Sequence, residues 1–143
     1  MTIAAILKHK GNEVARTSPS ATVGEVAQRL AAKRIGAVLV LDTADQVLGI
    51  LSERDIVASL ARHGGETLSM TAAQLMTRVL HTVTPDTTVG EAMEKMTRHR
   101  VRHLPVLDGA RLVGIVSIGD VVKTRIDQQA QEVDSLKAYV AGT

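Results

Sequence analysis

The sequence contains one unit of about 60 residues that occurs twice. The segment Pro-Ser-Ala-Thr-Val-Gly-Glu at 19–25 returns 66 positions later as Pro-Asp-Thr-Thr-Val-Gly-Glu at 85–91. Val-Leu-Asp at 40–42 recurs at the same offset, and Gly-Ile at 49–50 recurs at an offset of 65. Such a duplication restricts the fold to two similar supersecondary units. Because a unit of this size buries too little surface to be comfortably stable alone, each copy is expected to cover the other.

Local signals predict the order β-α-β-β-α in each copy. Thr22-x-x-Glu25 is a capping box that starts a helix, and Gly36 is expected to end it. The continuous apolar run Ala37–Leu41 is typical of a strand buried on both faces. The predicted elements are an extended piece at 14–17, helices at 22–34, 53–62 and 88–98, strands at 37–41, 47–51, 104–107 and 112–116, and a helix from 118. The fold class is therefore α/β (α+β), with sheet packed on sheet about a pseudo-two-fold axis that leaves two equivalent clefts.

Segments outside the repeats define the domain boundaries. A short apolar helix at 2–8 precedes the first copy, and its sequence resembles that of 71–76. We therefore divide the chain into a first repeat with its N-terminal helix at 1–67, a second repeat at 68–128, and a C-terminal helical extension at 129–143. Apolar residues continue at helical spacing through this extension, which indicates packing either against the other half's N-terminal helix or against a partner chain.

Composition excludes several classes of protein. Net charge is +2 and the only aromatic residue of the Phe, Trp and Tyr class is Tyr139, which argues against a nucleic-acid platform built on stacking. There are no cysteines, so disulfides, thiolate metal sites and a catalytic thiol are excluded. No signal-peptide pattern and no apolar run of membrane-spanning length is found, so the expected location is the cytoplasm.

Each copy carries Gly-x-x-Ser-x-x-Asp at the end of an apolar strand. In the first copy this places Ser52 and Asp55 at a helix start, and in the second Ser117 and Asp120. A hydroxyl and a carboxylate three residues apart form a capping box, which is one interpretation. The other interpretation is a nucleotide site, in which the carboxylate and the helix N-terminus hold a sugar and a phosphate.

These motifs resemble those of the CBS domain pair (cystathionine β-synthase domains, the Bateman module). The resemblance is carried by Pro-x-x-Thr-Val-x-Glu and Gly-h-h-Ser-x-x-Asp in both copies, where h is apolar, and by Leu-Pro-Val-Leu-Asp at 104–108. It covers nearly the whole chain up to about residue 128. It implies a regulatory module that binds an adenosine nucleotide, AMP or ATP, and associates as a homodimer that acts on an unidentified effector protein.

The resemblance also implies which residues bind the nucleotide. In the family, the Asp of Ser-x-x-Asp accepts both ribose hydroxyls, and the Ser can donate to phosphate. Family geometry places Asp55 and Ser52 in one cleft with Thr84, Val89, Val101, Arg102 and His103. It places Asp120 and Ser117 in the other with Ser18, Val23, Ile35, Gly36 and Ala37, and Arg54 could serve either cleft. Because only the Asp55 cleft then holds Arg102 and His103, it is expected to bind phosphorylated adenosine more tightly.

No catalytic constellation accompanies these motifs. Neither serine has a histidine at a readable spacing, and no Gly-x-x-x-x-Gly-Lys loop is present, so an enzyme is not expected. The histidines lack metal-ligand spacing, and the basic cluster at 98–103 is typical of a solvated helix end. No cofactor, metal, membrane or nucleic-acid partner is predicted. The alternative function is a ligand-free interaction or scaffold protein that acts through its C-terminal helix and dimer surface.

Overall fold

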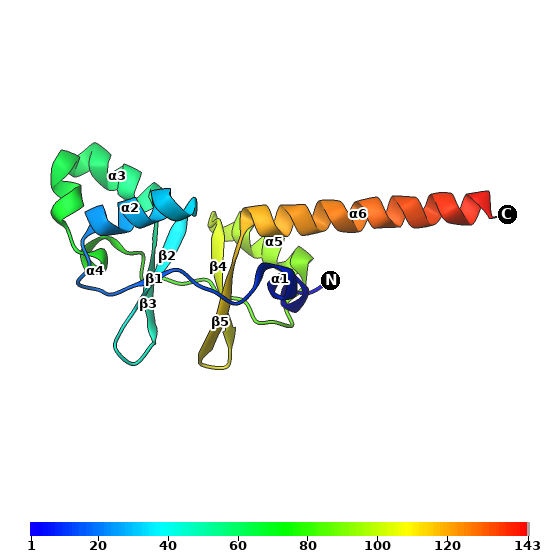
Figure 1. Cartoon of the computed structure of the whole chain (residues 1–143), viewed down its shortest axis with the longest axis horizontal. Helices are drawn as coiled ribbons and strands as arrows, with labels where there is room; N and C mark the ends of the chain where they lie inside the picture. Colours follow the sequence, from blue (N-terminus) through cyan, green and yellow to red (C-terminus); the bar gives the residue numbers. More distant parts are fainter. Residues whose placement is uncertain (143) are drawn as a thin grey trace. The chain divides into compact units, whose positions relative to one another are not determined.

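The chain folds into two units, which the computed structural model describes over residues 1–142. One unit is Glu13–Leu80, and the other combines Met1–Asn12 with the chain from His81 onward. Figure 1 labels the helices and strands of both units. Each unit is described by itself below.

The Glu13–Leu80 unit contains the first repeat in the predicted order. It consists of β1 (Arg16–Thr17), α2 (Val23–Lys33), β2 (Ala37–Leu41), β3 (Val47–Ser52) and α3 (Glu53–His63), followed by a 3-10 helix η1 (Gly64–Ser69) and α4 (Ala72–Leu75). Strand β2 lies centrally, parallel to β1 and antiparallel to β3. All five residues of β2 are buried, as its unbroken apolar run predicts.

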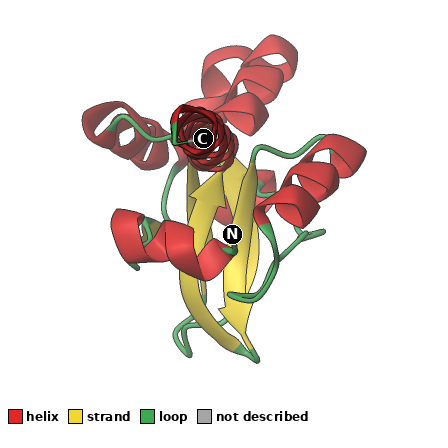
Figure 2. Ribbon diagram, turned by 90° about the vertical axis from the view of Figure 1, so that its right-hand side faces the viewer, coloured by secondary structure: helices red, strands yellow, loops and turns green. Residues whose placement is uncertain are grey.

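The second unit repeats this arrangement. Helix α1 (Ile3–Lys10) is joined by α5 (Val89–His99), β4 (His103–Asp108), β5 (Arg111–Ser117) and the 24-residue α6 (Ile118–Ala141). Strands β4 and β5 are antiparallel, and Val83 forms a parallel bridge with Val106 in the place that β1 occupies in the first unit. The tandem β-α-β-β-α fold is therefore confirmed, and the packing of one sheet on the other stays a prediction. Figure 2 shows α6 end on from its C-terminus, beside the strands.

The helix that precedes each repeat in the sequence packs in the unit of the other repeat. Thr2, the N-cap of α1, forms an antiparallel bridge with Thr88, the N-cap of α5. Thr71, the N-cap of α4, forms the same bridge with Thr22, the N-cap of α2. The resemblance between 2–7 and 71–76 thus reflects equivalent packing roles. As a result, the second repeat's unit includes the first residues of the chain.

The residue that ends α2 differs from the sequence prediction. Helix α2 ends at Arg34, which adopts the left-handed conformation (φ 54°), and Gly36 lies beyond the end without terminating it. Arg100 at the end of α5 is equivalent, with φ also 54°. After α3, Gly64 ends the helix, and the chain then continues into η1, which lacks an apolar periodicity by which the sequence could have predicted it.

Candidate functional site

Both Ser-x-x-Asp motifs form capping boxes. The backbone N–H of Asp55 donates to Ser52 Oγ (3.3 Å), and the backbone N–H of Ser52 donates to Asp55 Oδ2 (2.9 Å). In the second repeat the corresponding distances for Asp120 and Ser117 are 3.2 and 2.8 Å. In each repeat the serine hydroxyl also donates to the same Oδ2, at 3.0 Å. The capping interpretation is confirmed, and it uses one oxygen of each carboxylate.

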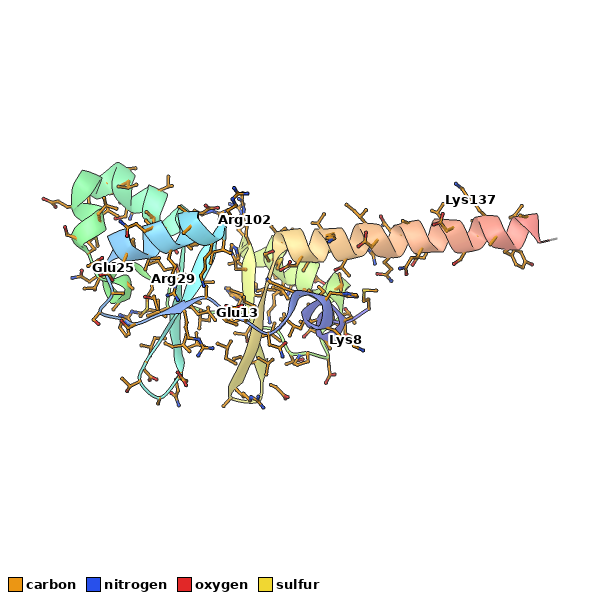
Figure 3. All side chains as sticks on the ribbon, viewed as in Figure 1. Lys8, Glu13, Glu25, Arg29, Arg102 and Lys137 are labelled. Carbon is orange, nitrogen blue, oxygen red and sulfur yellow. The ribbon has the colours of Figure 1, made fainter. Side chains whose placement is uncertain are left out.

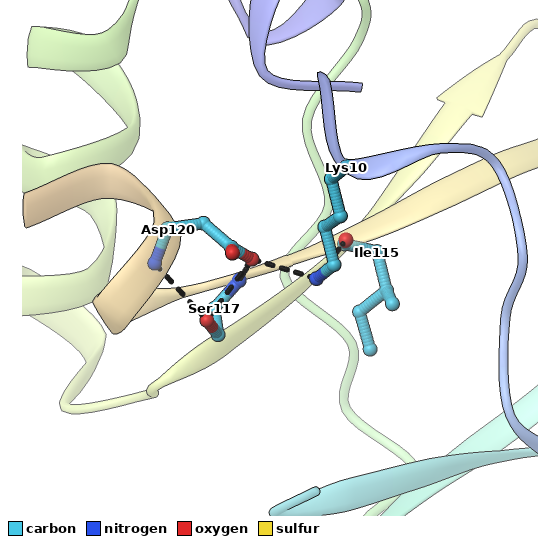
Figure 4. A network of polar contacts seen from close by, with 4 residues as sticks. All are labelled: Lys10, Ile115, Ser117 and Asp120. Atoms are coloured by element: carbon cyan, nitrogen blue, oxygen red, sulfur yellow. Dashed lines mark hydrogen bonds and ion pairs between the residues drawn. The ribbon is translucent and has the colours of Figure 1, made fainter. Parts of the chain in front are cut away.

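The two carboxylates differ in their remaining partners. Asp55 Oδ1 accepts a hydrogen bond from the Thr77 hydroxyl (3.2 Å), which the chain supplies just after α4. Asp120 instead receives an ammonium group, because Lys10 Nζ lies 2.6 Å from its Oδ2. Lys10 also donates to the carbonyl oxygen of Ile115 on β5 (2.9 Å), as Figure 4 shows. One repeat thus has a neutral hydroxyl at its aspartate and the other has a cation.

These contacts control the charge of Asp120. Burial raises the pKa of its carboxyl, but hydrogen bonds from Lys10 and Ser117 and the Lys10 charge outweigh burial and hold the pKa below its ordinary value. The carboxylate is therefore ionised at neutral pH. Since the bonds from Lys10 and Ser117 fall on Oδ2, they do not occupy Oδ1.

Asp120 lies in a pocket of about 390 Å³ between α1 and α6. Its wall carries charged and titratable groups together with an aliphatic side formed by Met1, Ala5 and Ile6. The charged and titratable residues are His9, Lys10, Asp120, Lys123 and Asp127. The pocket therefore offers carboxylates, ammonium groups and apolar surface within one unit.

In each repeat, the residue before the first strand of the antiparallel pair and the first residue of that strand lie beside the Ser-x-x-Asp motif of the same repeat. The Gly36 carbonyl accepts the Glu53 N–H (2.9 Å), and Ala37 pairs with Ser52. In the other unit the Arg102 carbonyl accepts the Ile118 N–H (2.8 Å), and His103 pairs with Ser117. The predicted grouping of Arg102 and His103 with Asp55, and of Gly36 and Ala37 with Asp120, joins residues of different units and stays a prediction.

The first repeat has a separate hollow of about 420 Å³ between α2 and α3. Ile35 and Gly36, two of the predicted ligand contacts, line it together with Arg34 and Glu53. The aspartate of this repeat is not among its lining residues. In the first repeat, then, the hollow and the acidic side chain are separate features.

Of the other predicted site residues, some belong to the hydrophobic cores and some are exposed. Val23 and Val89, the first residues of α2 and α5, belong to the hydrophobic cores of their units and are 0% and 1% exposed. Val101 packs against the core of its unit. Ser18, Arg54 and Thr84 are exposed, and the Thr84 N–H donates to Thr87 Oγ1 (3.0 Å).

Sequence reasoning did not identify Lys10 as a neighbour of Asp120. Arg54 is the one cation that the sequence analysis offers to Asp120, and the structure adds Lys10, which reaches this carboxylate from outside the repeat. Lys10 and Thr77 lie at positions that the duplication does not repeat, so comparing the two copies could not identify either. Gly11, the residue after Lys10, marks the end of α1 but does not indicate which carboxylate the lysine contacts.

Two kinds of feature are absent from the described residues, a cluster of metal ligands and a membrane-spanning helix. Between Met1 and Gly142, no three His, Asp or Glu side chains gather in a way that could hold a metal ion. Over the same residues, the helices include none with the length and apolar character needed to cross a membrane.

Comparison with known proteins identifies the family. The profile of the CBS domain matches residues 12–62 and 72–127. The CBS domain-containing protein CBSX3, mitochondrial, of Arabidopsis thaliana is 33% identical over 149 residues, which cover 99% of this chain and 72% of that protein. A crystal structure of a CBS-domain-containing protein from Agrobacterium tumefaciens is 41% identical with a TM-score of 0.85, covering 87% of this chain and 92% of that one.

A third relative is described with a bound ligand. The CBS domain protein from Pyrobaculum aerophilum, described as complexed with AMP, is 29% identical with a TM-score of 0.74 and covers 84% of this chain and 89% of that one. The sequence repeat, the fold of each unit and these matches agree. The chain belongs to the CBS domain family, with two tandem CBS domains at 12–62 and 72–127.

Proposed function

We propose that the protein is a regulatory module that binds an adenosine nucleotide, AMP or ATP, and that Asp120 is the residue that accepts the ribose hydroxyls. The observation that carries this proposal is the position of the Asp120 carboxylate in a pocket that also holds Lys10 and Lys123. The AMP complex of the Pyrobaculum relative supports the choice of ligand class.

The chemistry of the pocket matches the three parts of a nucleotide. The ionised Asp120 accepts hydrogen bonds from a vicinal diol, and charge-assisted bonds of this kind are roughly twice as strong as neutral ones. Lys10 and Lys123 supply ammonium donors for a phosphate, and Ala5 and Ile6 supply aliphatic surface for a base. A phosphate near Lys10 would compete with Asp120 for its ammonium group, so ligand binding would alter the contact that joins α1 to α6.

A regulatory outcome follows if the ligand binds two arrangements of the chain with different affinity. Since Lys10 and Asp120 come from elements far apart in the sequence, a ligand that draws them apart changes how α1 is held on α6. An effector protein that contacts either helix would sense this change. The function is then binding and signalling rather than catalysis.

The first repeat offers a second site in this proposal. Asp55 is engaged by Thr77 through Oδ1 and by Ser52 through Oδ2, so a diol must displace or share these contacts. The residues that we predict for this site are Ser52, Arg54, Asp55, Thr84, Val89, Val101, Arg102 and His103. Occupancy at both sites would give two nucleotides per chain.

Calorimetric titration with AMP, ATP and 2′-deoxy-AMP tests the proposal. We expect AMP to bind more tightly than 2′-deoxy-AMP, because the deoxy compound lacks one donor to the carboxylate. Asp120→Asn should weaken AMP binding at least tenfold, as loss of a charged hydrogen bond costs about 1.5–3 kcal/mol, and it should abolish the difference between the two ligands.

Asp127→Asn is the matched control, because it removes a carboxylate from the same pocket that is not paired with Lys10. It should change AMP affinity by less than threefold. The thermal melting point of each variant separates loss of binding from loss of folding. The proposal is wrong if AMP and ATP give no binding heat to the folded wild-type chain, or if Asp120→Asn and Asp127→Asn act alike.

A further inference from the structure

The C-terminal helix α6 carries a row of apolar side chains exposed to solvent. Val121 is the one residue of α6 in the described chain that is buried, and it lies in the core of its unit. Further along, Ile126, Val133, Leu136 and Val140 are 59%, 51%, 64% and 64% exposed. Figure 1 shows α6 running beyond α1 and α5 of the same unit, and Figure 3 shows Lys137 on this distal part. These exposed apolar side chains form a stripe along α6, and contiguous apolar surface of this kind marks a site of protein–protein contact.

The stripe follows a heptad repeat. Starting at Val122, the spacing of 4, 3, 4, 3 and 4 residues passes through Val122, Ile126, Gln129, Val133, Leu136 and Val140. This assigns the β-branched residues 126, 133 and 140 to heptad position a, and Val122, Gln129 and Leu136 to position d. The outward positions of the same turns hold polar residues, including Asp127, Gln131 and Asp134. The pattern is that of a coiled-coil seam.

The seam faces away from the part of α6 that packs on its own unit. Val121 and Val122 are neighbours, so their side chains are about 100° apart around the helix. Thr124 and Gln128 continue the Val121 side and are half-buried, whereas Val122 and Ile126 are exposed. Helix α6 thus has an inner face that packs on its own unit and an outer seam that its own unit leaves exposed.

We propose that a second copy of this chain covers the seam, and that two α6 helices form a parallel two-stranded coiled coil. All three a residues are β-branched and the last d residue is Leu136, a combination that favours two parallel strands. In this arrangement Glu132 at position g faces Lys137 at position e of the second copy, which is an attractive pair. Arg125 at g faces Ala130, so no like charges meet. Gln129 meets its own counterpart and can form a hydrogen bond with it, which fixes the register.

The charges disfavour the antiparallel alternative. An antiparallel pair that keeps the same seam aligned would place Glu132 against Glu132 of the second copy and Lys123 against Lys137. Both contacts are repulsive, and Gln129 would lie against the apolar Val133. The charged residues of α6 therefore favour the parallel over the antiparallel pair, and the apolar seam favours pairing itself.

Sedimentation equilibrium of the full chain and of two matched variants tests the seam. Leu136→Asp puts a charge at position d and should weaken dimerisation at least tenfold, whereas Ser135→Asp adds the same charge on the outer face and should leave it unchanged. Lys137→Glu should weaken the parallel dimer, and the double change Glu132→Lys with Lys137→Glu should restore it. In an antiparallel dimer Lys137→Glu would instead strengthen association, by facing Lys123.

Orientation is tested directly by a single cysteine, since the chain has none of its own. Val140→Cys should form a disulfide-linked dimer on mild oxidation, because the two residues at 140 face each other only in a parallel pair. The proposal would be overturned if the wild-type chain were monomeric at about 100 μM. Even a weak dimer with a Kd of ~10 μM would be mostly associated at that concentration. A dimer that Leu136→Asp does not affect and Val140→Cys does not cross-link would also overturn the proposal, because such a dimer associates through another surface.

Discussion

Lys10 Nζ lies 2.6 Å from Oδ2 of Asp120, although the two residues are 110 positions apart in the sequence. The contact ties the end of α1 to the first turn of α6, and the same lysine donates to the Ile115 carbonyl on β5. Its counterpart in the first repeat is the neutral hydrogen bond from Thr77 to Asp55. The duplicated chain thus has two related sites of different charge.

The first prediction concerns the pH dependence of stability. Because the pKa of Asp120 in the folded protein is below its ordinary value of 3.8, the unfolded chain binds this proton more readily. The stability from the Lys10 contact is therefore fully present above about pH 4 and is lost as pH falls through the folded pKa. Lys10→Met should lower the free energy of unfolding by up to ~1 kcal/mol at pH 7, the value for a partly exposed ion pair.

Urea denaturation at pH 7 and below pH 3 measures this effect. The difference between wild type and Lys10→Met should shrink as the pH falls through the folded pKa of Asp120. Lys8→Met, on the same helix and without an ion pair to Asp120, is the control and should show no such pH dependence. Equal losses at both pH values would mean that Lys10 acts through packing alone.

The second prediction concerns two strand glycines that the repeat places in equivalent positions. A Cβ on Gly49 would lie 2.7 Å from Met76 Sδ and 2.8 Å from the backbone oxygen of Thr77. A Cβ on Gly114 would lie 2.7 Å from Leu7 Cδ2, which is the end of a flexible side chain. Gly49→Ala should therefore lower the free energy of unfolding by about 1–3 kcal/mol, which is the usual cost of overpacking a core. Gly114→Ala should lower it by less.

Thermal and chemical unfolding of the two variants measure the difference. Gly90→Ala, in helix α5, is the control because nothing lies within 4 Å of its added Cβ. That change should be neutral or stabilising, since alanine favours a helix over glycine. A larger loss for Gly114→Ala than for Gly49→Ala would contradict the argument, because a side chain can move aside more easily than a backbone carbonyl.

The repeat made the fold predictable from the sequence. The capping boxes at Thr22 and Thr88 set the helix starts, and the apolar run at Ala37–Leu41 matches β2 residue for residue. These signals depend only on residues that are close in the sequence, so they can be recognised without knowledge of the tertiary contacts. The same is true of Ser52 and Ser117, whose capping role could be deduced from a spacing of three residues.

The site was less predictable because its partners are not local. Nothing in the sequence near Asp120 indicates that Lys10 reaches it, since that contact depends on α1 packing in the unit of the second repeat. Likewise Thr77 reaches Asp55 only because the segment after α4 pairs with Ile50 on β3. Long-range pairing decides which side chain meets each aspartate.

The third prediction concerns the capping serines. Ser52→Ala and Ser117→Ala each remove the hydroxyl that accepts the N–H of the third helical residue and that donates to the aspartate. Each should lower stability by about 1 kcal/mol. Ser→Thr at either position preserves the cap and should recover most of the loss. Amide hydrogen exchange at Asp55 and Asp120 is the direct measurement, because these N–H groups lose their acceptor only in the alanine variants.

The fourth prediction concerns the left-handed residue that ends α2. Arg34 has φ 54° and its N–H still donates toward the last turn of the helix, so it serves as the C-terminal cap. A residue with a Cβ in this conformation is disfavoured by roughly 1–2 kcal/mol, and glycine is not. Because glycine also gives the unfolded chain more freedom, the net gain for Arg34→Gly should be about 0.5 kcal/mol.

The matched control for this change is Lys33→Gly, one residue earlier and inside the helix. It should lower stability by up to about 1 kcal/mol, because glycine there gains no relief and weakens the helix. Opposite signs for two adjacent glycine substitutions would be difficult to explain by charge, since each removes one cation. If both variants lose stability equally, the left-handed backbone at Arg34 is not a source of strain.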